Sequence, residues 1–278
     1  MPELPEVETM RRGLLSTIGG TITAITEPII PYRPIKIDPP IKLFRKRVLH
    51  ATVVDVIRVA KRVLVALSTG DSIVMQPKMA GIAMISNPPS EQHTRIVFEL
   101  HGAEADRFFY WDKRGLGNVC LWTPGQIEEH LGPDKLGPDA SLVDQGTFLD
   151  RFCRIDREVK VALLDQRLVC GIGNLYAAEI LHAAKVHPAI RCNRVSKSIW
   201  KRLHRETIRI LNEAIENEGS TLNDGTYRNA INGEGNYQNK HLVYDRAGEA
   251  CLSCSKGTIS RIVQAQRSTF YCPICQIG

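Results

Sequence analysis

The feature that most constrains the fold is a pair of C-x-x-C motifs at the end of the chain. Cys251 and Cys254 form the first motif, Cys272 and Cys275 form the second, and seventeen residues separate them. Each motif can present two thiolates to one tetrahedral ion, and a shell of four cysteines leaves no open position for catalysis. The intervening runs TISRIVQ and STFYC are typical of hairpin strands. The spacing therefore predicts a β-hairpin module that folds around one structural Zn²⁺.

Two disulfides or a redox pair are the competing interpretations of these cysteines. The chain has no basic segment followed by an apolar core at its start, and no apolar run approaches about eighteen residues. We therefore expect a cytoplasmic protein without a membrane span, in which thiols stay reduced. A redox C-x-x-C would not need a duplicate. The other cysteines stand in or beside apolar runs and are expected to be ordinary buried thiols, namely Cys120, Cys153, Cys170 and Cys192.

Charge indicates the kind of partner. The 278 residues carry a formal net charge of +6, which suits nucleic acid but does not require it. Between the two cysteine motifs, Lys256, Arg261 and Arg267 are accompanied by no acidic residue. Arg267 lies near the hairpin turn, where a guanidinium can reach a phosphate. A stabilising clip is the plainer interpretation of the module, whereas its charge favours nucleic-acid binding.

A second basic stretch runs from Lys185 to Arg209 and contains one acid, Glu206. Five of its basic residues step by three or four positions and so share one helix face, namely residues 194, 197, 201, 205 and 209. A solvated face is the plainer explanation. Because like charges on one face repel each other, the pattern favours DNA or RNA as a partner.

The remaining sequence changes character near its middle. Residues 20–122 are mainly alternating or β-branched runs, and the segment 5–18 before them has helical spacing. Three helix candidates follow, at 159–169, 174–186 and 196–218. The fold expected is α+β and multidomain. Its parts are an N-terminal helix with a β-sandwich or flattened barrel (1–131), a linker (132–144), a helical domain (145–240) and the zinc hairpin (241–278).

Two short motifs gain meaning only in combination. In CGIGN (170–174) the glycines allow a tight turn, and Asn174 is expected to cap the next helix, whose start can also hold a phosphate. MPELPEVETM at the N-terminus favours a helix with proline in its first turn and acids near its positive end. Neither motif alone specifies a function.

Together, three motifs in order resemble one family. PELPEVET (2–9), GIGNLYAAEIL (171–181) and AQRSTFYCPIC (265–275) are similar to sequences of bacterial formamidopyrimidine-DNA glycosylases. That family excises oxidised purines, notably 8-oxoguanine, and nicks the abasic strand that results. The resemblance spans residues 2–275. It implies a β-sandwich with an N-terminal helix, a helix–two-turn–helix domain and a zinc hairpin, with no organic cofactor.

The resemblance also implies catalytic roles. The amine of Pro2 would attack the sugar at C1′, after removal of Met1. An α-amine titrates near pH 8, well below a lysine, so more of it is unprotonated at neutral pH. Glu3 would donate a proton to the opened sugar, and Glu6 would orient the helix end or the amine. Lys61 would be a cation of the catalytic pocket that steers the 3′ phosphate, whereas the plainer alternative is a snorkelling lysine.

Further residues match DNA-contacting positions of the family. Arg267 would grip the phosphates beside the lesion and assist δ-elimination, and Asn174 would hold another phosphate. His93 and Arg114 would also touch DNA. Excision needs a flipped nucleotide, so side chains must fill the gap in the stack. Met79, Arg114 and Leu116 match the positions that do so, and a loop at 223–241, rich in Gly and Asn and expected to be mobile, would recognise the lesion.

The chain departs from the family pattern at these positions. Lys113, Gly115 and Leu116 replace the usual Pro, Arg and Phe, and Gln76 stands where a histidine is usual. Leucine can act as an apolar wedge but stacks less than an aromatic ring, and Gly115 is expected to loosen the loop. For Glu8 we expect an exposed helical acid. The departures leave the preferred lesion and the opposite base open.

Two other functions compete with this one. An endonuclease VIII-like glycosylase would act on oxidised pyrimidines, and Leu116 is compatible with it. A zinc-containing DNA-binding protein without catalysis would explain the basic helix but not Pro2, Glu3 and Lys61 together. In each case the expected partner is double-stranded DNA, damaged DNA for the enzymes. We expect a monomer without an obligate protein partner and with no membrane association, located in the bacterial cytosol at the nucleoid.

Overall fold

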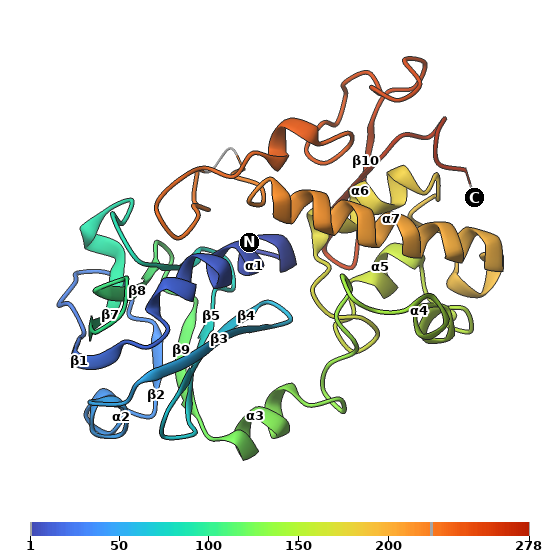
Figure 1. Cartoon of the computed structure of the whole chain (residues 1–278). Helices are drawn as coiled ribbons and strands as arrows, with labels where there is room; N and C mark the ends of the chain where they lie inside the picture. The colour runs from blue at the N-terminus through green and yellow to red at the C-terminus, as the bar shows by residue number, and fades with distance from the viewer. Residues whose placement is uncertain (1, 223–224, 278) are drawn as a thin grey trace. The chain divides into compact units, whose positions relative to one another are not determined.

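The computed structural model describes residues 2–222 and 225–277, which form two compact units (Figure 1). Unit 1 contains the described residues up to Gly132 together with Ile215–Gln238, and unit 2 contains Pro133–Ala214 and the described residues from Asn239 onward. The three domains and the linker expected from the sequence remain a prediction. By its contacts, however, the segment 215–238 belongs with the N-terminal unit.

Unit 1 begins with helix α1 (Leu4–Gly13), which continues as a 3₁₀ turn at Leu14–Thr17. This matches the helix expected at 5–18. Helices α2 (Ile41–Val48) and α3 (Pro124–Leu131) were not expected. The signal for α3 was present, because Thr123 and Gln126 form a capping box and Pro124 occupies the first turn.

The strands of unit 1 form two sheets. The four-stranded sheet has the order β1-β7-β8-β6, and the five-stranded sheet has the order β2-β9-β5-β4-β3. All neighbours are antiparallel except β2 and β9. The strands are β1 (Thr21–Thr26), β2 (Lys36–Asp38), β3 (Val53–Val59), β4 (Arg62–Leu67), β5 (Ser72–Gln76), β6 (Gly81–Met84), β7 (Thr94–His101), β8 (Arg107–Asp112) and β9 (Asn118–Trp122).

The core of unit 1 unites both sheets. Alternate residues such as Val63 and Val65 of β4 join one buried apolar cluster with Phe98 and Phe108 of the other sheet. The rings of Phe98 and Phe108 stack with their centroids 4.5 Å apart. A shared core between two sheets is a β-sandwich, so the expected fold class is confirmed.

Two chain crossings pass between the sheets at the same end of the sandwich. Gln76 at the end of β5 pairs with Asn118 at the start of β9, and Gly81 at the start of β6 pairs with Asp112 at the end of β8. The connections 77–80 and 113–117 therefore run side by side. We call them the two corner loops.

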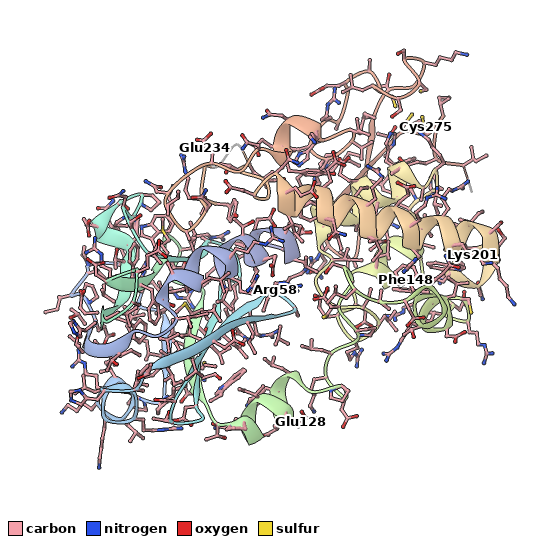
Figure 2. All side chains as sticks on the ribbon, in the orientation of Figure 1. Arg58, Glu128, Phe148, Lys201, Glu234 and Cys275 are labelled. Carbon is pink, nitrogen blue, oxygen red and sulfur yellow. The ribbon has the colours of Figure 1, made fainter. Side chains whose placement is uncertain are left out.

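Unit 2 contains helices α4 (Gln145–Phe152), α5 (Val159–Leu163), α6 (Asn174–Ala183) and α7 (Lys197–Glu216), the last of which ends in unit 1. Phe152 stacks on Trp200 with centroids 5.3 Å apart, and Phe148 packs beside them (Figure 2). The helix expected at 159–169 is wrong beyond Leu163. There the amide of Gln166 bonds to Leu164 O, Ile172 O and Gly171 N, which stabilises a turn instead of a helix.

The last element of unit 2 is the hairpin of β10 (Ser260–Gln264) and β11 (Arg267–Tyr271). Its two turn residues, Ala265 and Gln266, have φ of 45° and 60°, a conformation that residues other than glycine rarely adopt. Beneath the hairpin, Phe270 and Ile259 pack with Ala178 of α6. Among the described residues, none of the helices combines the length and the apolar character needed to cross a bilayer.

Candidate functional site

The N-terminal segment of unit 1 is buried. Glu3 and Glu6 are 4% and 3% exposed, and Pro2 is buried with them. Glu6 Oε2 accepts the backbone N–H of Glu3 at 2.8 Å in a capping box, while Glu6 Oε1 accepts the N–H of Ser220 at 2.9 Å. One carboxylate thus fixes the start of α1 and connects it to a segment near residue 220.

The segment after α7 is shaped to receive this carboxylate. Gly219 has φ of +77°, and a Cβ there would lie 2.8 Å from Glu6 Oε1. The Tyr227 hydroxyl donates to Glu218 O at 2.9 Å and to Glu6 O at 3.4 Å. Burial and the nearby charge of Glu6 raise the pKa of Tyr227 well above its usual range, so this phenol remains a donor.

The loop expected at 223–241 is only partly described, because residues 223–224 lie outside the described residues. Its middle is packed against the sandwich. The carboxamide oxygen of Asn229 accepts the N–H groups of Ile231 and Gly233, and Ala230 O accepts the N–H of Ile85 at 2.9 Å. This part of the loop has a defined position in unit 1.

The expectation of an exposed Glu8 is wrong. Glu8 is 9% exposed and accepts hydrogen bonds from Arg11, Arg12 and Arg58. Burial raises its pKa, but the bonds and charges of the three arginines outweigh this and lower it. Arg58 belongs to β3, so this cluster fastens α1 to the sheet.

Lys61 does not lie within a strand. It occupies the two-residue turn between β3 and β4, where the preceding Ala60 has φ of 54°. Its side chain is half-buried, and α1 packs against both strands that this turn joins. The turn holds the lysine at the rim of the sheet beneath the N-terminal helix.

The candidate stack-filling residues occupy the two corner loops. Met79, 41% exposed, lies in loop 77–80, while Arg114 and Leu116 lie in loop 113–117. The expectation that Gly115 loosens this loop is wrong, because the backbone N–H groups of residues 114–117 all bond to the carboxylate of Asp112. The structure therefore brings the three predicted residues to one end of the sandwich.

Gln76 and His93, the two remaining predicted positions of unit 1, both pack against neighbouring side chains. The Gln76 side-chain amide lies against the Asn118 amide and the Arg62 guanidinium. His93 is 9% exposed, with its ring 4.6 Å from that of Tyr32 and 5.6 Å from that of Trp111. Burial and the charges of Arg95 and Lys113 lower the pKa of His93, so it is neutral at pH 7.

In unit 2, Asn174 does not cap α6. The cap position is Gly173, and Asn174 is the first helical residue. Asn174 Oδ1 accepts a hydrogen bond of 2.6 Å from Lys160 Nζ, and Asn174 Nδ2 donates to Ser268 O at 2.9 Å. Lys160 is fully buried, and Ser268 directly follows the exposed Arg267. The asparagine thus joins helix α6 to the strand that carries the arginine.

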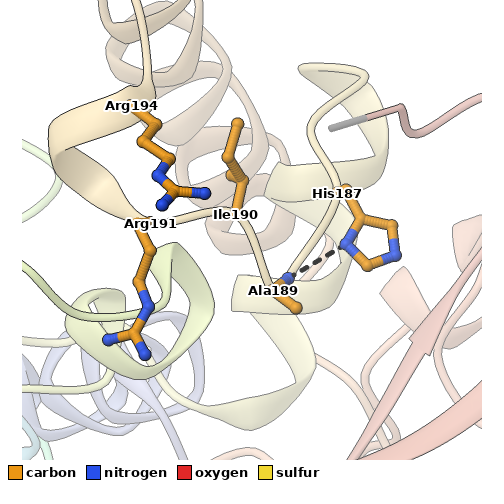
Figure 3. Close-up of a pocket in the computed structure, with 5 residues that line it drawn as sticks. All are labelled: His187, Ala189, Ile190, Arg191 and Arg194. Carbon is orange, nitrogen blue, oxygen red and sulfur yellow. Dashed lines mark hydrogen bonds between the residues drawn. The ribbon is translucent and has the colours of Figure 1, made fainter.

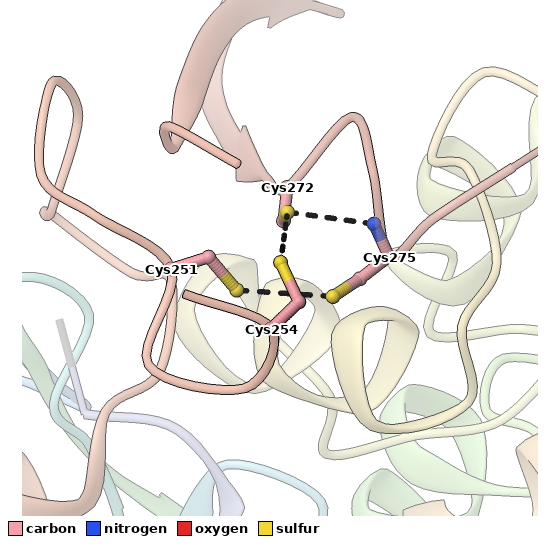
Figure 4. A group of neighbouring side chains, drawn as sticks. All are labelled: Cys251, Cys254, Cys272 and Cys275. Atoms are coloured by element: carbon pink, nitrogen blue, oxygen red, sulfur yellow. Dashed lines mark hydrogen bonds between the residues drawn. The ribbon is translucent and has the colours of Figure 1, made fainter. Parts of the chain in front are cut away.

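The four terminal cysteines form one cluster (Figure 4). Their Sγ atoms all lie within 4.8 Å of one another, and the pairs Cys251–Cys275 and Cys254–Cys272 are 3.8 Å apart. Zn–S bonds of about 2.3 Å in a tetrahedron require sulfur separations of about this size. The N–H groups of Lys256 and Gly257 lower the pKa of Cys254, whereas burial raises the pKa of Cys272 and of Cys275. The cluster fits a structural zinc ion.

The basic face of α7 is partly neutralised, contrary to the expectation of unrelieved like charge. Arg205 and Arg209 pair with Glu206 at 3.0 and 2.7 Å, and Arg209 also reaches Glu213 at 3.0 Å. Repulsion along this face therefore gives little reason to require a polyanion.

A separate open pocket of about 480 Å³ lies on unit 2 (Figure 3). Its lining includes His187, Arg191 and Arg194. His187 Nδ1 accepts the N–H of Ala189 at 3.2 Å, and Arg191 donates to Asp156 O at 3.0 Å. Arg191 and Arg194 belong to the basic stretch noted in the sequence, but the lining contains none of the predicted catalytic, DNA-contacting or metal-binding residues.

Comparison with known proteins defines the family. Three family models match successive parts of the chain: the formamidopyrimidine-DNA glycosylase N-terminal domain (residues 1–119), its H2TH domain (131–226) and a zinc finger found in FPG and IleRS (248–277). The chain belongs to the formamidopyrimidine-DNA glycosylase family. It is 34% identical to the formamidopyrimidine-DNA glycosylases of Caulobacter vibrioides and Streptococcus mutans, and each alignment covers at least 99% of both chains.

Solved structures of the glycosylase family show the same fold. The MutM (FPG) protein of Thermus thermophilus has a TM-score of 0.85 and 32% identity, over 99% of this chain and 98% of that one. A Lactococcus lactis FPG variant in complex with a Fapy-dG containing DNA has a TM-score of 0.87 and 30% identity over the whole of both chains. The helix–two-turn–helix and zinc-hairpin expectations are therefore confirmed.

Sequence reasoning missed several residues that organise this glycosylase site. Nothing in the local sequence marks Ser220, because its hydrogen bond to Glu6 joins positions 214 apart. Lys160 is marked only weakly, as a lysine within the apolar run VKVALL. Asp112 gave no signal of its own, and its role follows from the loop that folds around it.

Proposed function

We propose that this glycosylase excises oxidised purines, such as 8-oxoguanine and formamidopyrimidines, from duplex DNA and then cleaves the abasic strand by β,δ-elimination. The observation that carries the proposal is the buried start of α1, where Pro2 is buried and the Glu6 carboxylate accepts the N–H of the next residue, Glu3. Family membership and the relatives crystallised with Fapy-dG or abasic-site DNA support the substrate class.

The chemistry begins at Pro2. Once Met1, which lies outside the described residues, is removed, the secondary amine attacks C1′ and the bond to the base breaks. The nitrogen lone pair then forms a cationic iminium as the C1′–O4′ bond breaks and opens the sugar, and the iminium makes the C2′ proton acidic. Loss of that proton expels the 3′ phosphate, and a second elimination expels the 5′ phosphate. Hydrolysis of the iminium restores the free amine.

The other residues act on protons and phosphates. Glu3, directly beside Pro2, protonates the opened sugar O4′. Lys61, at the turn beneath α1, and Arg267, at the start of β11, attract the phosphates that leave. His93 contacts the DNA, and Asn174 holds another phosphate of its backbone. Met79, Arg114 and Leu116 fill the gap left by the flipped nucleotide. Cys251, Cys254, Cys272 and Cys275 would hold a zinc ion that stabilises the hairpin and takes no chemical part. The enzyme acts as a monomer without a protein partner, in the bacterial cytosol at the nucleoid.

Borohydride trapping tests this function directly. Protein with a C-terminal tag should form a covalent adduct with duplex DNA that contains 8-oxoguanine or an abasic site, because borohydride reduces the iminium to a stable amine. The same protein with an N-terminal tag should form none, since its proline nitrogen lies within a peptide bond. Absence of any adduct with the C-terminally tagged protein would favour a non-catalytic DNA-binding protein.

A substrate comparison separates the two glycosylase classes. Excision of 8-oxoguanine should be faster than excision of thymine glycol under single-turnover conditions. The reverse order would assign the chain to the endonuclease VIII-like class instead.

A further inference from the structure

We propose that Asp112 is a positioning residue that pre-organises the corner loop 113–117 for filling the DNA stack, an inference that rests on the proposed function. Asp112 touches no substrate in this scheme. It acts through Arg114 and Leu116, the two side chains of that loop assigned to the gap.

The first support is the hydrogen bonding of the Asp112 carboxylate. Asp112 is fully buried at the end of β8. Its Oδ1 accepts the N–H groups of Arg114 and Gly115 at 2.9 and 3.1 Å, and its Oδ2 accepts those of Leu116 and Gly117 at 3.0 and 2.6 Å. Four N–H groups on one charged acceptor are strong, directional restraints, so they determine the path of the loop backbone.

The second support is the backbone around Gly115. This residue has φ of +61°, and a Cβ here would fall on the carbonyl oxygen of Arg33. Arg95, itself buried, donates to that same oxygen at 3.0 Å and to Asp112 O at 2.8 and 2.6 Å. Gly115 therefore permits a close approach between two segments that Arg95 ties together.

The third support connects this loop to its neighbour. The Tyr110 hydroxyl donates to Gln76 O at 2.8 Å, at the start of the corner loop that carries Met79. A Cβ on Gly81 or Gly117 would clash with this hydroxyl, so both glycines leave room for it. The two corner loops are thus held in one geometry by a buried polar group beneath them.

This arrangement has a consequence for a chain whose wedge is leucine. A leucine fills less of the gap than an aromatic ring and gains less from stacking. Binding by a loop that already has its bound conformation costs less ordering entropy. A rigid loop can therefore offset the smaller contact made by Leu116.

The test uses two substrates that differ in whether a gap exists. Excision of 8-oxoguanine from a duplex requires the gap to be filled, whereas elimination at a preformed abasic site in single-stranded DNA does not. D112N removes the second carboxylate oxygen as an acceptor but keeps the shape of the side chain. It should slow duplex excision by at least about tenfold, because the oxygen that is lost accepts two of the four loop N–H groups and each bond to a charged acceptor is worth about tenfold or more. Elimination on the single strand should change less than about twofold, because no interaction that this step needs is lost.

Two further variants make the result specific. G115A strains the same loop from another side and should show the same selective loss. D144N is the matched control, because Asp144 accepts an N–H of α4 at 2.9 Å in unit 2, and it should change neither rate. The effect of D112N should also shrink when Leu116 is already alanine, since both changes remove the same function.

The outcomes separate this inference from the proposed function. Equal losses on both substrates, no loss with D112N, or full additivity with Leu116→Ala would each overturn the positioning role. A wild-type protein inactive on both substrates would overturn the proposed function and the inference with it.

Discussion

The carboxylate of Glu6 and the backbone N–H of Ser220 are joined by a hydrogen bond of 2.9 Å across 214 positions of sequence. The same carboxylate accepts the N–H of Glu3 at 2.8 Å. One side chain therefore fixes both the start of helix α1, next to Pro2, and the start of the segment 219–238. A change at Glu6 should affect both.

Glu6→Gln should destabilise unit 1 and slow base excision. Glutamine supplies one acceptor oxygen where two N–H groups need one each, and its own N–H group then faces a donor. Leaving one buried donor unsatisfied costs about 1–3 kcal/mol of unfolding free energy. Urea denaturation measures the loss. Glu104→Gln, at an exposed loop position, is the control and should change neither stability nor excision. Unchanged stability in Glu6→Gln would show that this linkage is not required.

Asn174→Ala should weaken the attachment of the zinc hairpin to α6. The change removes the bond to Ser268 O and leaves the fully buried Lys160 without this acceptor. We expect a loss of about 1–3 kcal/mol in stability, faster amide exchange in β11 and weaker DNA binding through a displaced Arg267. Asn174→Asp retains the acceptor for Lys160 and should lose less stability. Unchanged exchange in β11 with Asn174→Ala would argue against the attachment.

Removal of the metal should abolish DNA binding. The hairpin module has little apolar core, so zinc binding supplies much of its folding energy. Mild chelation should release one zinc ion per chain, measured by metal analysis, with loss of duplex affinity in fluorescence anisotropy. Cys254→Ser should also lose zinc and duplex affinity, whereas Cys153→Ser, outside the cluster, should keep both. Two zinc ions per chain, or full affinity without zinc, would contradict this expectation.

Glu8 should make stability depend on pH. Burial raises its pKa, but the bonds and charges of Arg11, Arg12 and Arg58 lower it in the folded chain. Its contribution is therefore present above the unfolded pKa, near 4.5, and is lost as the pH falls through the lower folded value. The gap in unfolding free energy between wild type and Glu8→Gln should narrow from pH 7 to pH 3. A gap that is constant with pH would exclude this role.

Much of this structure could be predicted from sequence because its signals are local. The cysteine spacing predicts the zinc cluster, and the alternating runs of residues 20–122 predict the sandwich. Helical spacing over 5–18, with proline and acids in the first turn, predicts α1. Each depends on residues a few positions apart, where backbone geometry fixes which side chains can meet.

The errors arise where distant residues decide the structure. Glu8 was expected to be exposed because its partner Arg58 lies in strand β3, 50 positions away. Asn174 was expected to be a cap because its partner Ser268 lies 94 positions away. Gly115 was expected to loosen its loop because its close approach to Arg33 O, which Arg95 also binds, involves residues far away in the sequence. Tertiary contacts override local propensity at each of these positions.

The last prediction concerns the wedge itself. Leu116→Phe should tighten binding to a duplex that contains an abasic-site analogue, because an aromatic ring fills more of the gap and stacks on the neighbouring bases. Stacking on aromatic side chains is worth about 1–3 kcal/mol per base in single-stranded complexes, so we expect at least a several-fold gain. Fluorescence anisotropy on duplex and single-stranded forms of the same oligonucleotide checks this.

The gain should be confined to the duplex, since the single strand offers no gap to fill. Leu142→Phe is a matched control, because Leu142 is an exposed leucine of unit 2 at 80% exposure, and it should leave both affinities unchanged. Equal tightening on both forms would indicate general apolar adhesion. No tightening on either would remove Leu116 from the group of residues that enter the stack.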